Sequence, residues 1–259
     1  MGMNPRARTH TQMRALGLIS GVLWLTGLTA SQAEQRFTSG PAQVALLELF
    51  TSEGCSSCPP MEKWLGSLRD DPQLWLTVVP VAWHVNYWDR LGWKDVYASK
   101  SYTHRQYAYA KSWRSNSVYT PCLVRNGQEW RRGSSTSQAK PNIGELTLSY
   151  QADQSCRITY KPPVGTTGLK YEVTVALLGN DITSRVRAGE NAGRNLAHEF
   201  IVLSTVNSAM TLDAHGNLST TLVLPASPAP APPRYSIAAW ITRQGEFEPV
   251  QATGGWLRQ

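Results

Sequence analysis

The hydrophobic pattern of the sequence changes once, near residue 133, and this change constrains the fold more than any other feature. Before it, apolar runs of strand length at residues 44–50 and 74–83 flank a segment, 61–68, with the period of an amphipathic helix. After it, the helical period disappears. Alternating strands and helices are typical of an α/β domain, so we expect one in the first half of the chain.

Further along this half, the tyrosine-rich residues 99–113 predict a second helix, and Asn126-Gly127 predicts a β-hairpin. Residues 134–144 have the composition of a linker. Short strand-like runs with turn residues between them then follow, which favours an all-β, sandwich-like domain over residues 145–259. The runs are residues 146–150, 156–160, 171–178, 182–187, 199–206, 218–224, 235–241 and 247–251.

Residues 1–33 have the organisation of a secretory signal peptide. A basic start precedes an apolar run over 15–28, and the small residues Ser31 and Ala33 have the spacing of a cleavage site. The alternative is a retained membrane anchor, but the run is short for a bilayer core about 30 Å thick. We therefore expect a periplasmic or secreted protein that is not embedded in the membrane after cleavage. Disulfides persist in such compartments.

The net charge of +7 does not indicate nucleic-acid binding. Three of the basic residues, Arg6, Arg8 and Arg14, lie in the predicted signal peptide. The other lysines and arginines do not cluster with aromatic residues as they do in a nucleic-acid groove. With 41% hydrophobic and 17% charged residues, the chain also has the composition of a folded protein rather than a disordered one.

Cys55 and Cys58 stand between the first predicted strand and the first predicted helix. A thiol at a helix N-terminus faces unpaired backbone N–H groups, which favour the thiolate. Two intervening residues, Ser56 and Ser57, allow the sulfur atoms to meet. We predict that Cys55 is the more exposed, attacking thiol and that Cys58 is the buried, resolving thiol.

Five segments of the chain carry a resemblance to a known family, and they are residues 49–60, 84–95, 105–106, 119–121 and 189–199. On these segments, the chain resembles an uncharacterised family of bacterial secreted thioredoxin-like proteins. The resemblance implies a thioredoxin-like domain over residues 34–133 with a β-rich extension, but it implies no reaction because the family has none assigned. Asn86 stands where the family has Asp, and Cys122 where it has Gln.

Four further residues are candidates for positioning a substrate. In a thioredoxin fold, a cis-proline faces the CxxC pair, and Thr120-Pro121 stands at the corresponding point of this chain. The aromatic loop 84–95 contributes Trp88 and His84. This loop either lines a substrate groove or simply packs its rings, and the sequence leaves both interpretations open.

The leading hypothesis is a thiol–disulfide oxidoreductase that uses Cys55 and Cys58 as its catalytic residues and needs no cofactor. Its expected partners are protein disulfides or dithiols, with a membrane redox protein as a candidate electron partner. One alternative is a copper-binding chaperone that uses Cys55, Cys58 and His84. Another is a non-catalytic envelope protein that binds partners on a thioredoxin scaffold.

The remaining cysteines and the β-rich half leave several interpretations open. Cys55–Cys58 is alternatively a purely structural disulfide, and Cys122 and Cys156 are either paired or free. His198 is expected to be a structural histidine. Residues 189–193 are expected to form a glycine-containing turn.

Overall fold

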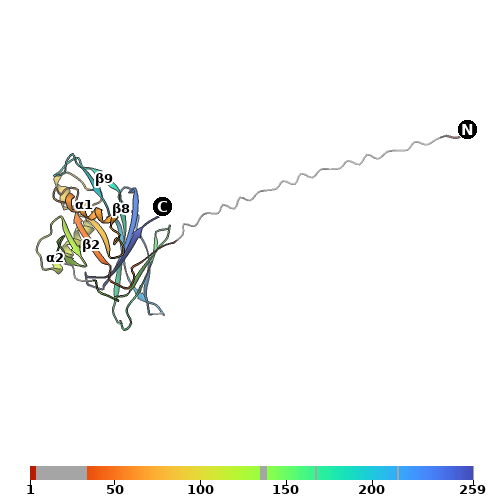
Figure 1. Cartoon of the computed structure of the whole chain (residues 1–259). Coiled ribbons are helices and arrows are strands. Elements are labelled where there is room, and N and C mark those ends of the chain that lie inside the picture. Colours follow the sequence, from red (N-terminus) through yellow and green to blue (C-terminus); the bar gives the residue numbers. More distant parts are fainter. Residues whose placement is uncertain (4–33, 135–138, 167, 215, 259) are drawn as a thin grey trace. The chain divides into compact units, whose positions relative to one another are not determined.

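Strands from both halves of the sequence lie in one eight-stranded sheet, in the order β15-β14-β8-β11-β3-β2-β4-β5. The computed structural model describes residues 1–3, 34–134, 139–166, 168–214 and 216–258 (Figure 1). The first half contributes β2 (Ala45–Thr51), β3 (Val78–His84), β4 (Cys122–Arg125) and β5 (Gln128–Glu129). The second half contributes β8 (Tyr171–Asn180), β11 (Ile201–Ala209), β14 (Arg234–Arg243) and β15 (Pro249–Trp256).

Two smaller sheets complete the β structure. A five-stranded antiparallel sheet has the order β1-β6-β7-β13-β12, and β9 pairs with β10 in a two-stranded sheet. The strands are β1 (Gln35–Thr38), β6 (Glu145–Tyr150), β7 (Ser155–Lys161), β9 (Ile182–Arg185), β10 (Asn195–His198), β12 (Thr211–Leu212) and β13 (Leu218–Val223).

The central strand β8 divides its side chains between two hydrophobic cores. Val173 and Val175 belong to the core that β8 and β14 share with the five-stranded sheet. Ala176 and Leu178 belong to a second core with β2 and β3. Successive side chains of a strand point to opposite faces, so one strand serves both cores. The chain is therefore a β-sandwich in which the larger sheet is covered on both faces.

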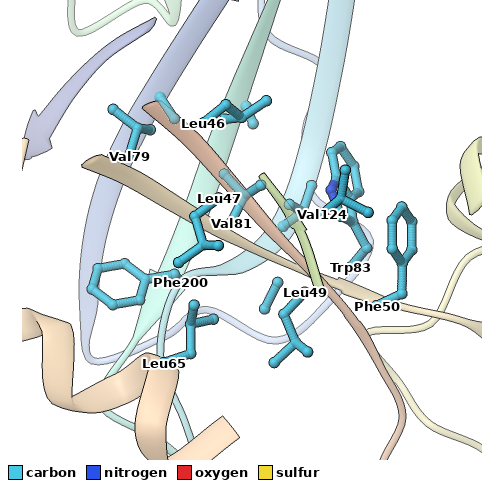
Figure 2. Packing of buried hydrophobic residues seen from close by; sticks show 14 of the residues in the cluster. Leu46, Leu47, Leu49, Phe50, Leu65, Val79, Val81, Trp83, Val124 and Phe200 are labelled. Atoms are coloured by element: carbon cyan, nitrogen blue, oxygen red, sulfur yellow. The ribbon is translucent and has the colours of Figure 1, made fainter. Parts of the chain in front are cut away.

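Helices cover the β2 end of the large sheet on opposite faces. Thr51 of β2 donates a hydrogen bond to Glu62 of α1 (Pro59–Ser67), whereas Phe50 packs edge-on against Tyr109 of α2 (Lys100–Ser112). Because neighbouring residues of β2 face opposite ways, every residue of this strand is buried. Figure 2 shows Leu65 of α1 directed into this core. The short 3-10 helices η1 (Leu68–Asp70) and η2 (Asn86–Leu91) follow α1 and β3.

Pro80 shows how the two halves of the chain join. A proline within a strand favours a bend or a position near the edge of a sheet, yet β3 lies inside the sheet between β2 and β11. Ala82 N donates a hydrogen bond to Phe200 O, next to β11. Residues two apart in a strand have the same orientation, so the backbone nitrogen of Pro80 also faces β11. The parallel ladder between β3 and β11 is limited to Ile201 and Ala82. The missing N–H of Pro80 therefore falls outside that ladder and costs no hydrogen bond.

The prediction of an α/β thioredoxin-like domain followed by an all-β sandwich-like domain is wrong. Residues 32–259 form one compact unit, predominantly of β-sheet, and strands from both sides of residues 134–144 share the same sheet. Periodicity located the elements but did not reveal that β11 pairs with β3. The predicted signal peptide lies almost wholly outside the described residues, as do residues 135–138 of the predicted linker.

The turn between β4 and β5 has the geometry that its sequence predicts. The Asn126-Gly127 hairpin between β4 and β5 is confirmed, and both turn residues have positive φ, at 48° and 80°. No helix within the described part of the chain is long and apolar enough to span a bilayer.

We expect the two halves to unfold together, because Trp240 of β14 packs against Trp83 of β3 with ring centroids 6.1 Å apart. Trp240→Ala should lower the free energy of unfolding by about 3–5 kcal/mol. Urea titrations followed by far-UV circular dichroism and tryptophan fluorescence should give one coincident transition. Leu212→Ala, at a residue 70% exposed, is the control and should change little. Two separated transitions would contradict the shared core.

Candidate functional site

The CxxC segment forms a tight loop between β2 and α1. Cys58 is the N-cap residue of α1, and Pro59 and Pro60 occupy the first helical positions, where missing N–H donors cost little. Cys58 N donates to Cys55 O at 3.2 Å, which closes the loop. All four cysteines are free thiols. Contrary to the prediction that Cys55 is the more exposed, neither Cys55 nor Cys58 has any exposed surface.

The two thiols of this loop differ in acidity. The contact with Cys58 lowers the pKa of Cys55 to about 6, helped by Ser57 and Thr120 and opposed by burial. Burial, reinforced by the sulfur of Cys55, raises the pKa of Cys58 far above its ordinary value. At neutral pH, the loop therefore holds one thiolate and one thiol.

Three of the predicted substrate-positioning residues meet beside Cys55. The Thr120–Pro121 peptide bond is cis, and Thr120 O lies 3.7 Å from Cys55 Sγ. Trp88 Nε1 donates to Thr120 Oγ1 at 2.8 Å. Trp88 also packs closely on Gly54, since a Cβ added to this glycine would lie 2.9 Å from Trp88 Cβ. Thr120, in the loop before β4, therefore lies against the sulfur of Cys55, and Trp88 of the aromatic loop lies against both Thr120 and the residue before Cys55.

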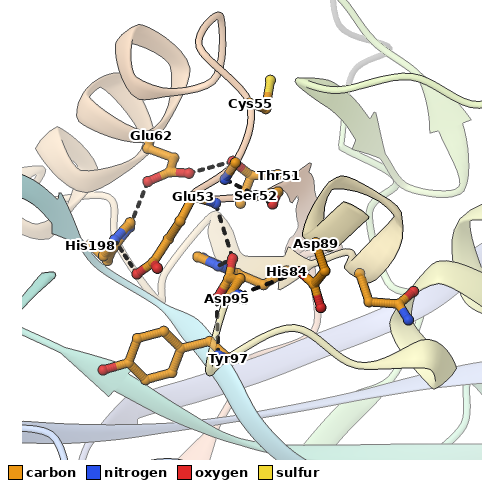
Figure 3. A network of polar contacts seen from close by, with 12 residues as sticks. Thr51, Ser52, Glu53, Cys55, Glu62, His84, Asp89, Asp95, Tyr97 and His198 are labelled. Carbon is orange, nitrogen blue, oxygen red and sulfur yellow. Dashed lines mark hydrogen bonds and ion pairs between the residues drawn. The ribbon is translucent and has the colours of Figure 1, made fainter. Parts of the chain in front are cut away.

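His84, the fourth predicted residue, belongs instead to a buried cluster below the loop (Figure 3). We call this cluster the histidine–carboxylate cluster. Figure 3 shows the sulfur of Cys55 pointing away from it. The cluster consists of buried residues only: Thr51, Glu53, Glu62, His84, Asp95 and His198.

His198 connects two carboxylates of the cluster. Its Nδ1 lies 2.6 Å from Glu62 Oε2, and its Nε2 lies 3.3 Å from Glu53 Oε1. His84 Nδ1 lies 2.7 Å from Asp95 Oδ2, and that oxygen also accepts a hydrogen bond from Glu53 N at 3.0 Å. The cluster thereby joins the CxxC loop, α1, β3 and β10.

The charges of this cluster stabilise one another. Burial disfavours the imidazolium form of His198, but Glu62 and Glu53 outweigh it and raise its pKa to about 10. Burial also disfavours the imidazolium form of His84, but the charge of Asp95 outweighs burial and raises the pKa of this ring. Burial also disfavours ionised carboxylates, yet the imidazoles hold the pKa values of Glu53, Glu62 and Asp95 below their usual range.

The geometry separates His84 from the predicted copper ligands. One of its ring nitrogens lies within 4.8 Å of one ligand atom of Glu62 and one of His198, and this group does not include the sulfurs of Cys55 and Cys58. Nothing in the described contacts therefore favours a copper site made of Cys55, Cys58 and His84.

A segment from the second half fixes the backbone of the CxxC loop. Asn191 Nδ2 donates to Glu53 O and to Cys55 O, both at 2.9 Å. Glu190 accepts hydrogen bonds from the backbone and the hydroxyl of Ser56, at 3.0 and 2.7 Å. Sequence reasoning assigned this segment to a turn and missed its contact with the loop.

Cys122 and Cys156 lie in different parts of the fold, and only Cys122 is near the loop, since it follows the cis Thr120–Pro121 bond beside Cys55. Cys122 belongs to the core around β2, and Cys156 to the core of the five-stranded sheet. Burial raises the pKa of Cys122 to about 11 and that of Cys156 to about 12. Both behave as buried, protonated thiols, so neither extends the Cys55–Cys58 pair.

The fold and the site together define a class: predominantly β-sheet proteins that hold a dithiol loop at a helix N-terminus above a buried histidine–carboxylate cluster. The sequence matches the family described as "Protein of unknown function (DUF1223)" over residues 46–242, and the chain belongs to that family. The predicted membership of an uncharacterised family is confirmed. A search of curated proteins finds no significant match.

Solved structures share the fold. A crystal structure of a protein from Agrobacterium tumefaciens is 23% identical with a TM-score of 0.55, and the match covers 84% of this chain and 98% of that one. HBP35 of Porphyromonas gingivalis is 15% identical with a TM-score of 0.61, and the match covers 85% of this chain and 76% of that one. At these identities, the likeness extends to the fold alone.

Asn191→Ala should loosen the CxxC loop, because it leaves the buried carbonyl of Glu53 without the side-chain donor that it has now. We expect a loss of about 1–3 kcal/mol in stability and faster hydrogen exchange of the amides in residues 53–58. Asn195→Ala, at an exposed position in β10, is the matched control. Unchanged exchange in residues 53–58 would show that Asn191 does not hold the loop.

Proposed function

We propose that this protein is an exported thiol–disulfide oxidoreductase in which Cys55 attacks and Cys58 resolves. The observation that carries the proposal is the opposite direction of the two pKa shifts within one loop. The pKa of Cys55 is lowered to about 6, and the pKa of Cys58 is raised. A thiolate is the nucleophile in disulfide exchange, and a protonated neighbour is held back until the first bond has formed.

The proposed reaction begins when the Cys55 thiolate attacks one sulfur of a substrate disulfide. A Cys55–substrate disulfide forms, and the other substrate sulfur leaves as a thiolate that takes up a proton. Cys58 then loses its proton, attacks Cys55 Sγ and expels the second substrate thiolate. The substrate disulfide is reduced by two electrons, and Cys55 and Cys58 become a disulfide. The same steps in reverse oxidise a substrate dithiol.

The surroundings of Cys55 favour a protein substrate rather than a small molecule. The flanking Ser56 and Ser57 are exposed, although the sulfur itself is covered. Exchange therefore requires a local displacement of the residues over Cys55, of which Trp88 and Thr120 are linked by a hydrogen bond. An extended protein segment that displaces Trp88 and Thr120 replaces their lost contacts with new contacts of its own, which a small molecule has too little surface to make. Thr120, Pro121 and Trp88 are thus proposed to position the substrate.

The proposed location is the periplasm or the extracellular medium, where disulfide exchange on exported proteins takes place. The signal-like organisation of residues 1–33 supports this location. Protein disulfides or dithiols are the proposed substrates, and a membrane redox protein is the candidate partner that returns the Cys55–Cys58 pair to its starting state.

Alkylation kinetics should report the thiolate of Cys55. Its pKa of about 6 lies below the ordinary value, so the rate with iodoacetamide should rise as pH increases through 6 and level off above about pH 7. Cys58→Ala removes the leading cause of the lowered pKa and should move the midpoint upward. Cys122→Ala and Cys156→Ala should leave the profile unchanged. A wild-type midpoint near 8.5 would contradict an activated Cys55.

Turnover should depend on both cysteines of the loop but in different ways. Cys55→Ser should abolish reduction of insulin by the dithiothreitol-coupled protein, whereas Cys58→Ser should accumulate a mixed disulfide detectable by mass spectrometry.

Titration against glutathione should place the reduction potential of the Cys55–Cys58 pair between about −270 and −120 mV, the range of known CxxC proteins. Cys122→Ser is the matched control. If the folded protein shows neither turnover nor mixed disulfide, the loop only binds partners and the proposal fails.

A further inference from the structure

Three side chains of the histidine–carboxylate cluster face one another in the arrangement of a metal-binding site. Glu62 comes from α1, His84 from β3 and His198 from β10. Each offers one ligand atom, and these atoms lie within 4.8 Å of one another. All three residues are buried, and none of them is needed for the proposed thiol chemistry.

Each of the three is held from outside by a second polar group. Asp95 holds Nδ1 of His84 at 2.7 Å, and Glu53 lies 3.3 Å from Nε2 of His198. Thr51 donates to Oε1 of Glu62. A carboxylate behind the outer nitrogen of a histidine is the usual second-shell support of a metal ligand, since it fixes the ring and increases its basicity.

The inner nitrogen of His84 has no partner. His84 has 0% exposed surface, and its Nε2 forms no hydrogen bond with the described residues. A buried polar atom without a partner is uncommon and needs an explanation. Asp95 already holds Nδ1 of His84. Nε2 is therefore the nitrogen of this ring that is left to bind a ligand.

We propose that Glu62, His84 and His198 bind a divalent first-row transition-metal ion of the zinc class, through two imidazole nitrogens and one carboxylate oxygen. This mixture of nitrogen and oxygen donors is common in zinc proteins. Glu53 and Asp95 add negative charge around the site and favour a dication there. The proposal does not depend on the redox activity of Cys55 and Cys58.

Loading requires a small local movement and the loss of a proton from each imidazole that is protonated, since only a neutral imidazole binds a metal ion. His198 Nδ1 and Glu62 Oε2 now lie 2.6 Å apart, whereas two ligands of one zinc ion are separated by about 3.3 Å for metal–ligand bonds of 2.0–2.1 Å. The space around the cluster, lined also by Leu65, Ala82 and Ile201, has no room for a water molecule. The ion therefore takes the place of the direct contact between His198 and Glu62 and fixes α1 to β10.

The test uses Zn²⁺ as the probe and the Cys55→Ser/Cys58→Ser double variant as the main sample, which removes both thiols of the loop. Metal-stripped protein is incubated with Zn²⁺, passed through gel filtration and measured for zinc. We expect about one ion per chain in wild type and in the double variant. His84→Gln in the double-variant background should weaken binding by at least about 100-fold, and Asp95→Asn by about 10- to 100-fold.

His104→Gln is the matched control, because His104 is exposed on α2 and should bind zinc no differently. Zinc that is lost in the double variant would assign the ion to the thiols and overturn the proposal, as would full retention by His84→Gln. If His84→Gln does not fold, Co²⁺ loading of the double variant decides: visible absorption bands of nitrogen and oxygen coordination support the site, and their absence overturns it. Since the main sample has no redox pair, failure of the proposed oxidoreductase activity does not affect this result.

Discussion

Two buried imidazoles between three buried carboxylates hold together the CxxC loop and the elements around it. Removing charge from water costs several kcal/mol per ion unless a partner compensates for it, so each member of the cluster depends on the others. His198 is the central member, since it lies between Glu62 of α1 and Glu53 of the segment that leads into the CxxC loop. Through this residue, the second half of the chain determines where the first half places its cysteines.

The shared sheet makes that dependence possible. β10, which carries His198, precedes β11 directly, and β11 is the strand that pairs with β3 of the first half. Phe200 lies between them in sequence, is fully buried, and packs in the core with Trp75. The polar cluster therefore lies directly beside the seam between the two halves, where packing holds it in place.

Local sequence patterns predicted the elements well and their assembly poorly. The apolar run before Cys55 and the helix after Cys58 are where periodicity placed them, because each is a property of consecutive residues. The pairing of β11 with β3 joins segments more than 100 residues apart, and no local pattern encodes it. His198 appeared to be an ordinary structural histidine because its partners, Glu53 and Glu62, become neighbours only after that pairing. Asn191 was missed for the same reason, since its acceptors lie at residues 53 and 55.

The different pKa values of the free thiols determine which cysteine reacts in disulfide exchange. With pKa values of about 6 for Cys55 and about 11 and 12 for Cys122 and Cys156, the thiolate fractions at pH 7 differ by a factor on the order of 10⁴ or more. Cys122 and Cys156 also belong to separate hydrophobic cores. The folded chain thus holds Cys122 and Cys156 in a kinetically silent form, and wrong disulfide pairings become accessible only when one of the two cores opens.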